Sequence, residues 1–294
     1  MSKTKKFVAL FLALTLAFSM LALAGCGGED TDEGTTDEGT STERAAIESV
    51  DDLGEGDKVG VQSGTTGEQW AKENLEPKGV EVVPYDTAVA AFQALKAGDV
   101  IGVINDITVS LDVTKDQSLG AEVVQEISTD EGYGLGFNKS NTALRDAVNW
   151  GLQEAVADGT YAEIYEKWFG IAPETLPEVS GYSKPTTELK TIVAGKITVG
   201  SDTSFPPYES VEGDEIVGFD VDLVAEIAKR IGLESEFKTY NFDALVPAMQ
   251  AGTEFDMIAS GMTATGEKGA ERSQQIDFSE LYAWNNQSLS VLSK

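Results

Sequence analysis

The sequence predicts an α/β fold that contains two copies of one β-α-β-α-β unit, at about residues 58–104 and 197–259. Two observations predict this fold. In both segments, short apolar runs alternate in the same order with amphipathic runs of helical periodicity. The second helix of each unit also ends in a similar way, at Ala97-Gly98 and at Ala251-Gly252. Each unit is therefore predicted to form a parallel sheet with helical connections.

The elements of the first unit follow from periodicity and from turn residues. Apolar runs predict strands and amphipathic runs predict helices, and a glycine after the last helical residue marks the end of a helix. The predicted strands are residues 58–62, 79–85 and 100–104, and the predicted helices are residues 66–75 and 87–96.

The second unit repeats this order after a loop that contains Pro206 and Pro207. Its first helix places five apolar side chains on one face and is closed by Gly232. The predicted strands are residues 197–200, 234–240 and 255–259, and the predicted helices are residues 220–231 and 242–250.

Polar residues follow the predicted strands in both units. Parallel strands joined by right-handed crossovers place ligands beyond their carboxyl ends. With Phe205, Tyr208 and Phe242 nearby, these residues predict a cleft for a small polar molecule that has an apolar stem. The alternative is that the Ser and Thr residues only cap helices. The polar segments are Ser63-Gly64-Thr65-Thr66, Asn105-Asp106, Ser201-Asp202 and Ser260-Gly261-Met262-Thr263.

Composition excludes several classes of function. The chain has no histidine and one cysteine, so the usual catalytic triads and zinc sites are not expected. Residues 62–67 resemble a P-loop only in composition, because they lack its lysine, and no cofactor is predicted. With 50 acidic and 21 basic residues, the net charge of -29 argues against binding to nucleic acid or to anionic headgroups.

The N-terminus has the layout of a secretory signal. Lys3, Lys5 and Lys6 precede an apolar run at residues 7–23, and Cys26 follows Ala24-Gly25 where a lipoprotein signal is cut and acylated. The alternative is a transmembrane helix. We expect a signal at residues 1–25, lipidation of Cys26 and a flexible acidic linker at residues 26–46. This layout predicts an exported protein, lipid-anchored to the outer face of the cell membrane or in the periplasm.

Most of the remaining chain resembles a known family. Residues 200–208, 217–223, 259–263 and 276–279 are similar to the first lobe of polar amino-acid-binding proteins of ABC importers. Residues 62–67, 103–106 and 159–170 resemble the second lobe and the closing helices of that family. The family is the bacterial extracellular solute-binding protein family 3, with a two-lobed periplasmic-binding-protein fold of type II. The resemblance implies a ligand cleft between the lobes.

The order of the segments departs from that family, in which the unit beginning near Lys196 comes first. The chain therefore resembles a circularly permuted member. Lobe two is predicted at residues 47–133 and lobe one at residues 134–294, with a crossover at residues 131–134 and a second hinge strand at residues 287–292. Residues 171–195, which contain three prolines, would be the permutation linker.

By resemblance, an arginine and backbone N–H groups hold the ligand's α-carboxylate, and an aspartate holds its α-ammonium. A zwitterion that leaves water needs a partner for each charge. Asp106 is our candidate for the ammonium, with a helix cap as the alternative, and Thr65 and Thr66 are at a helix start that favours an anion. Family spacing from Thr263 selects Lys268, whereas spacing back from Asp277 selects Arg272. A four-residue insertion at residues 266–269 reconciles the two counts, and we favour Arg272.

Side-chain selectivity is expected from Asp202, Gln62, Asn105, Phe205 and Phe242, with Ser260 and Gly261 completing the site. Asp202 could accept hydrogen bonds from an amide or a cationic head, and the two aromatic rings could flank the stem or belong to the core. Glutamine, arginine, lysine and histidine all stay possible.

The resemblance implies a monomeric binding protein that delivers a polar amino acid to the permease and ATPase of an ABC importer. It is not expected to be an enzyme. Two alternatives stay open: a periplasmic dehydratase-like enzyme on the same scaffold, and a ligand-sensing protein. The enzyme needs a cleft acid that is not engaged by ligand, and Asp106 and Asp202 both have binding explanations.

Overall fold

The structure, a computed structural model, describes residues 46–293. The predicted signal at residues 1–25, the lipidated Cys26 and the linker up to residue 45 lie outside the described residues, and these three features stay predictions.

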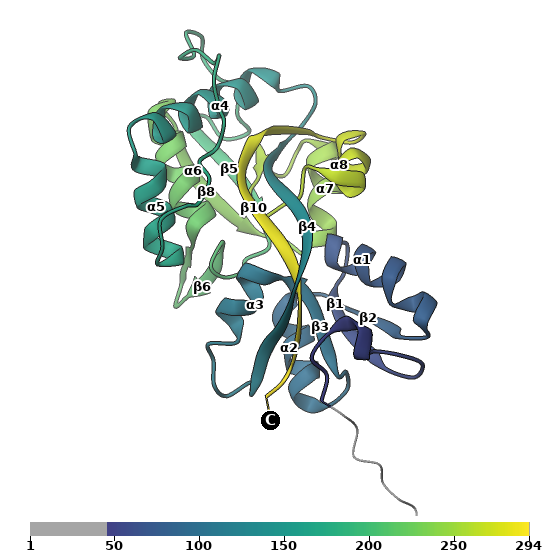
Figure 1. The fold of residues 1–294 in the computed structure, drawn as a ribbon. Coiled ribbons are helices and arrows are strands. Elements are labelled where there is room, and N and C mark those ends of the chain that lie inside the picture. Colours follow the sequence, from purple (N-terminus) through teal and green to yellow (C-terminus); the bar gives the residue numbers. More distant parts are fainter. Residues whose placement is uncertain (1–45, 294) are drawn as a thin grey trace, which may run out of the picture. The chain divides into compact units, whose positions relative to one another are not determined.

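The first predicted unit is confirmed and forms what we call the N-terminal unit (Figure 1). Strand β1 is central and pairs in parallel with β2 and β3. The side chain of Thr65 caps α1, and that of Thr87 caps α2, which ends at Gly98 in the left-handed conformation. The unit comprises η1 (Val50–Asp52), β1 (Lys58–Gln62), α1 (Thr66–Asn74), η2 (Glu76–Lys78), β2 (Glu81–Tyr85), α2 (Ala88–Ala97), β3 (Gly102–Asp106) and α3 (Ile107–Val113).

The second predicted unit is also confirmed, and we call it the C-terminal unit. Strand β5 pairs in parallel with β8 and β9. The predicted strand at residues 255–259 is shorter than expected, and the β6–β7 hairpin and helix α8 were not predicted. The unit comprises β5 (Lys196–Ser201), β6 (Ser210–Glu212), β7 (Glu215–Val217), α6 (Phe219–Arg230), β8 (Glu234–Thr239), α7 (Phe242–Ala251), β9 (Met257–Ile258) and α8 (Gly266–Ser273).

Two long antiparallel strands connect the units. Strands β4 (Ala121–Phe137) and β10 (Asp277–Leu292) pair with each other over nearly their whole length. One end of this pair joins β3 and the other joins β9, so that a single sheet runs through both units in the order β2-β1-β3-β10-β4-β9-β5-β8. Figure 1 shows the two strands side by side between the units. The expected crossover at residues 131–134 lies within β4.

Helices α4 (Thr142–Ala157) and α5 (Thr160–Phe169) pack on α6 of the C-terminal unit. The ring of Phe219, at the start of α6, is fully buried and lies 5.2–6.2 Å between centroids from five other rings. These rings join α5, α6 and β10, although long connections separate them in sequence. They belong to Tyr161, Tyr165, Phe169, Tyr208 and Tyr282.

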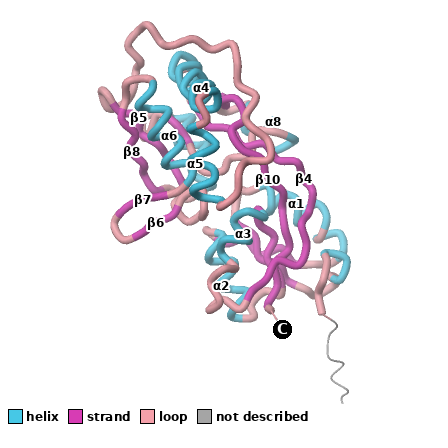
Figure 2. The backbone as a smooth tube through the Cα atoms, turned by 60° about the vertical axis from the view of Figure 1, so that its left-hand side comes forward, coloured by secondary structure: helices cyan, strands magenta, loops and turns pink. Residues whose placement is uncertain are grey.

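Residues 170–195 connect α5 to β5 without a helix or a strand, and Figure 2 shows them as one long loop. The loop is held to the C-terminal unit by several hydrogen bonds. The hydroxyl of Tyr182 donates to Glu280 at 2.5 Å, the side chain of Asn141 donates to the carbonyl of Lys190 at 3.1 Å, and the amide of Ile192 donates to Asp256 at 2.8 Å.

Replacing Phe219 with Ala is expected to destabilise the protein by about 3–5 kcal/mol, because it leaves a cavity at the centre of the ring cluster. Urea unfolding followed by circular dichroism measures this change. Val211→Ala, at a residue that is 55% exposed on the β6–β7 hairpin, is the matched control and should change stability little. A loss below about 1 kcal/mol for Phe219→Ala would show that the cluster does not hold these elements together.

Candidate ligand-binding site

The polar strand ends of the two units meet across the molecule. The side-chain amide of Gln62, at the end of β1, donates to the carboxylate of Asp202, just after β5, at 2.5 Å. The guanidinium of Arg272, on α8, donates to the backbone carbonyl of Gly64 at 3.1 Å. The structure therefore brings together the residues that follow β1, β3, β5 and β9, as the strand order predicts.

Asp106 is the last residue of β3, and its carboxylate is buried. It accepts hydrogen bonds from the hydroxyl of Tyr133 and the side-chain amide of Gln287, which lie on β4 and β10. Although Asp106 occupies the N-cap position of α3, its side chain makes no capping hydrogen bond. Burial, with a smaller contribution from the nearby Glu131 carboxylate, raises the pKa of Asp106 to about 7.

Arg272 is buried at the wall where the units meet. Its guanidinium donates to the carbonyl of Thr263 at 2.9 Å, in addition to Gly64, and lies 5.4 Å from the ring centre of Phe242. Burial lowers the pKa of Arg272 to about 10, so the group stays charged at neutral pH. Lys268, the alternative from sequence spacing, instead forms a 2.8 Å ion pair with Glu271 one turn along α8.

Asp202 and Ser260 form the wall on the side of the C-terminal unit. The backbone amide of Asp202 donates to the hydroxyl of Ser260 at 2.9 Å, and the hydroxyl and amide of Ser204 donate to the Asp202 carboxylate. Burial raises the pKa of Asp202, while the hydrogen bonds from Ser204 and Gln62 oppose that shift.

Sequence reasoning did not identify the acid pair of Glu209 and Asp220 behind this wall. Both side chains are fully buried, and the two carboxyl groups lie close together. Ser260 donates to Glu209 at 2.7 Å, and the backbone amide of Gly261 donates to Asp220 at 3.3 Å. Burial raises the pKa of Glu209 well above its usual range and that of Asp220 to about 7. Because charging two neighbouring buried carboxylates is costly, we expect the pair to share one proton, held on Glu209.

Glu131, on β4, was also missed as a site residue. Its carboxylate is 5% exposed and accepts hydrogen bonds from both units. The hydroxyl of Thr66 donates to it from the start of α1, and the hydroxyl of Thr263 donates from the C-terminal unit, each at 2.6 Å. Glu131 is therefore a third buried acid beside Asp106 and Asp202, and it was not among the predicted site residues. No local pattern could reveal Glu131, because β4 brings it to the cleft from far along the chain.

The remaining predicted residues have local partners. The hydroxyl of Thr65 caps α1 and donates to the carbonyl of Gln62 at 2.8 Å. The side chain of Asn105 donates to the carbonyl of Asp106 at 3.4 Å. Phe205 is buried against Tyr208, with ring centres 5.8 Å apart, and Phe242 lies in a separate apolar cluster. Both aromatic rings are thus part of the core beside the site.

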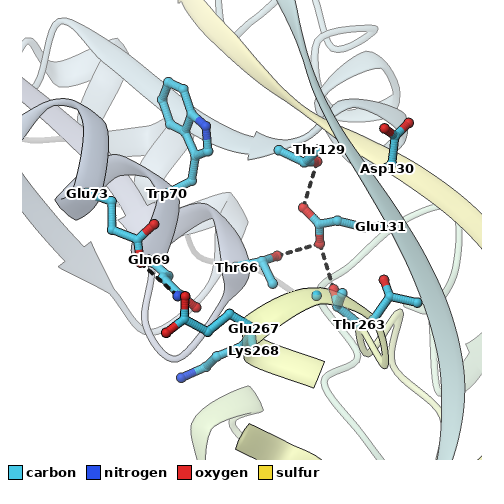
Figure 3. Close-up of a pocket in the computed structure, with 12 residues that line it drawn as sticks. Thr66, Gln69, Trp70, Glu73, Thr129, Asp130, Glu131, Thr263, Glu267 and Lys268 are labelled. Atoms are coloured by element: carbon cyan, nitrogen blue, oxygen red, sulfur yellow. Dashed lines mark hydrogen bonds between the residues drawn. The ribbon is translucent and has the colours of Figure 1, made fainter. Parts of the chain in front are cut away.

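A cavity of about 250 Å³ adjoins the carboxylate of Glu131 (Figure 3). Its walls come from α1, β4 and the start of α8, so both units and the connecting strands contribute to it. The lining residues are Thr66, Gln69, Trp70, Glu73, Thr129, Asp130, Glu131, Thr263, Thr265, Gly266, Glu267 and Lys268. The insertion inferred at residues 266–269 therefore borders this cavity.

Two α/β units that present polar strand ends to each other, connected by a strand pair, define a ligand-binding protein of the periplasmic type II fold. The chain belongs to the bacterial extracellular solute-binding proteins, family 3, whose profile matches residues 53–171 and 197–294. Members of this family act outside the cytoplasm. Among residues 46–293, no helix is both long enough and apolar enough to span a membrane.

Several curated relatives resemble part of the chain. Over 87 residues it is 40% identical to the arginine-binding extracellular protein ArtP of Bacillus subtilis, a match that covers 30% of this chain and 32% of ArtP. Over 124 residues it is 36% identical to the L-cystine-binding protein TcyJ of Escherichia coli K12, covering 42% and 46% of the two chains. The glutamine-binding protein GlnH of Bacillus subtilis is 33% identical over 129 residues, covering 43% and 45%. The chain thus spans a third to a half of the length of these relatives.

Among solved structures, an ancestral arginine-binding protein bound to arginine is 40% identical, with a TM-score of 0.26. The match covers 28% of this chain and 35% of that one.

The acid pair behind Ser260 predicts how stability depends on pH. The pKa of Asp220 lies above its unfolded value, so the folded state binds more protons between about pH 4 and pH 7. Stability should therefore fall as the pH rises through this window. Asp220→Asn has no proton to lose, and its melting temperature should fall less than that of the wild type between pH 5 and pH 8, by roughly 3–6 °C.

The raised pKa of Asp106 also lowers stability as the pH rises, to the same extent in the wild type and in Asp220→Asn. The other titratable groups near Asp220 are Glu209, Asp202 and Tyr282. Glu215→Gln on the exposed β7 strand is the matched control. Equal pH slopes for Asp220→Asn and the wild type would contradict the shared proton.

Proposed function

We propose that this protein captures a polar amino acid outside the cytoplasm and delivers it to the permease and ATPase of an ABC importer. The observation that carries the proposal is the placement of two opposite buried charges at one site. Burial lowers the pKa of Arg272, from the C-terminal unit, and the carboxylates of Glu131 and of Asp106, from the N-terminal unit, are near enough to oppose that shift. A zwitterion offers one partner to each of these groups.

The names of the relatives support the class of ligand. ArtP, TcyJ and GlnH are named for binding arginine, cystine and glutamine, which are all amino acids. The site of the present chain contains Asp202 and Gln62, which can accept from and donate to a polar side chain. Glutamine, arginine, lysine and histidine are the ligands to test first.

The site residues are assigned by chemistry. Arg272, with its planar fork of donors, would hold the α-carboxylate together with the groups at the start of α1. Asp106 would hold the α-ammonium, and Asp202, Gln62 and Asn105 would face the ligand side chain. Phe205 and Phe242 would support the site from the core.

Attachment of the protein to the membrane would be through a lipid on Cys26, with the acidic segment after it as a tether. This arrangement keeps a monomeric binding protein near its permease without burying part of the folded chain. It would place the protein on the outer face of the membrane.

We also propose that the chain is a circular permutation of the family's usual order. The two ends of the described chain meet at the beginning of β4, where the amide of Val50 donates to the side chain of Gln125 and the amide of Ser293 donates to the carbonyl of Gly120. The family profile omits residues 172–196, which fall in the loop between α5 and β5. A circular permutation accounts for both observations. It would open the usual chain where the two ends of the described chain now lie and would join the usual ends through the loop between α5 and β5. Lobe two and lobe one would then each be a continuous segment. The exceptions are the last part of β4, which pairs with β9, and the last part of β10, which pairs with β3.

Calorimetric titration against the twenty amino acids tests the function. The protein is residues 26–294 with Cys26→Ser, so that it is not acylated. We expect one-to-one binding of a polar amino acid on the order of micromolar, or about -8 kcal/mol. Arg272→Ala and Asp106→Ala should each weaken it by about 2–5 kcal/mol, because each leaves one ligand charge without a partner.

Lys268→Ala is the matched control, since this residue is the less favoured alternative to Arg272 and pairs with Glu271 at the surface. It should bind nearly as tightly as the wild type. A folded protein that binds none of the twenty amino acids would refute the proposal, and turnover of a prephenate-like substrate would assign the enzyme instead.

Binding should also depend on pH through Asp106. An ammonium group needs the charged carboxylate, and the pKa of Asp106 in the free protein is about 7. Lowering the pH from 8 to 5.5 protonates this group and should weaken binding by roughly 30-fold. The other titratable groups near it are Glu131 and Tyr133. Titration at four pH values measures the effect, and Asp106→Asn should bind weakly with a much flatter profile. An unchanged slope in that variant would assign the ammonium to another acid.

A further inference from the structure

Glu131 occupies the position of an anion in the site. Its four donors are the hydroxyls of Thr66, Thr263 and Thr129 and the side-chain amide of Gln287, at 2.6–2.9 Å. Figure 3 shows the carboxylate directed at the three threonines between the two units. Two of these donors, Thr66 and Thr263, belong to the polar segments that the sequence predicts to line the ligand cleft. A carboxylate of the protein therefore uses donors that a ligand carboxylate would need.

Among the described residues, neither Glu131 nor Arg272 forms an ion pair in the site. Within residues 46–293, Glu131 forms no ion pair, and its hydrogen bonds come from uncharged groups. The guanidinium of Arg272 likewise donates to two backbone carbonyls and not to a carboxylate. A guanidinium and a carboxylate can pair through two parallel N–H···O bonds, which adds both energy and geometric specificity. An incoming carboxylate could therefore form such a pair with Arg272.

The backbone beside Glu131 departs from regular strand geometry. Asp130, directly before it, has a φ of 50°, which is uncommon for a residue other than glycine. The pairing of β4 with β10 also shifts register between Asn285 and Gln287, opposite this segment. The cavity of about 250 Å³ borders the Glu131 carboxylate and offers it space away from the threonine hydroxyls.

We propose that Glu131 is an internal competitor for the ligand's α-carboxylate. In the unliganded protein it joins the two units through Thr66 and Thr263, and a bound amino acid displaces it from these hydroxyls. The competition sets specificity, because it weakens ligands through their carboxylate and leaves carboxylate-free amines unaffected. This inference rests on the proposed function and adds a specificity-determining residue to it.

The test compares ligand pairs that differ only in the α-carboxylate, in the wild type and in Glu131→Gln. L-Arginine and agmatine form the first pair, and L-lysine with cadaverine and L-glutamine with 4-aminobutanamide form the others. Glu131→Gln keeps the size of the side chain and removes its charge. We expect it to bind the amino acid about tenfold more tightly and the carboxylate-free amine no more tightly, so that the ratio of the two dissociation constants rises about tenfold or more.

Glu267→Gln is the matched control, because it removes the same charge from the wall of the same cavity at a residue that has no hydrogen bond to Thr66 or Thr263. The ratio of dissociation constants should stay at the wild-type value in this variant. A purely long-range effect of charge would instead change both variants alike, and that result would overturn the proposal.

Two other results would overturn it. An unchanged ratio in Glu131→Gln means that the carboxylate does not compete, and a lower ratio means that Glu131 assists the ligand. If Glu131→Gln does not fold, as judged by thermal unfolding, Glu131→Asp is used, because its shorter side chain cannot reach both hydroxyls. An intermediate rise of the ratio is then expected, and no rise overturns the proposal. Failure of every amino acid to bind the folded wild type refutes the proposed function itself, and this inference with it.

Discussion

The antiparallel pairing of β4 with β10 is the interaction on which the rest of the structure depends. These two strands turn two separate parallel sheets into one sheet, and they are the strands that pass from one unit to the other. They also supply Tyr133 and Gln287, which hydrogen-bond to Asp106. The same pairing that connects the units therefore also supports Asp106 in the candidate site.

Burial of charge is the second constraint. Asp106, Asp202, Glu131, Glu209 and Asp220 are all buried near one another, and Arg272 is the buried arginine among residues 46–293. Carboxylates in this number are tolerated only where hydrogen bonds or protons compensate them. Both means apply here, because burial raises the pKa of Glu209 and of Asp220, which favours a retained proton, and Glu131 accepts hydrogen bonds from three hydroxyls. The site consequently has an excess of acid, which suits a ligand that brings a positive charge.

Sequence reasoning correctly located both α/β units, because their apolar periodicity and glycine stops are local signals. It also named Asp106 and Arg272, both of which lie buried where the units meet. Sequence reasoning did not predict the full length of strands β4 and β10. The alternation of buried and exposed side chains along them is irregular, because different parts of each strand face different units. Sequence reasoning expected Phe205 and Phe242 either to flank the ligand stem or to belong to the core, and both rings lie within apolar clusters. The roles of the site residues stay predictions.

The sequence by itself determined the order of the elements, the polar strand ends, the excess of acid and the resemblance to a family. These features depend on neighbouring residues and on composition. The tertiary structure alone decided which acids share a site. Glu131 is 65 residues from Thr66 and 132 from Thr263, and Gln62 is 140 residues from Asp202. Contacts at such separations form only when the connecting strands bring the units together, and burial then changes the pKa of each acid by removing water.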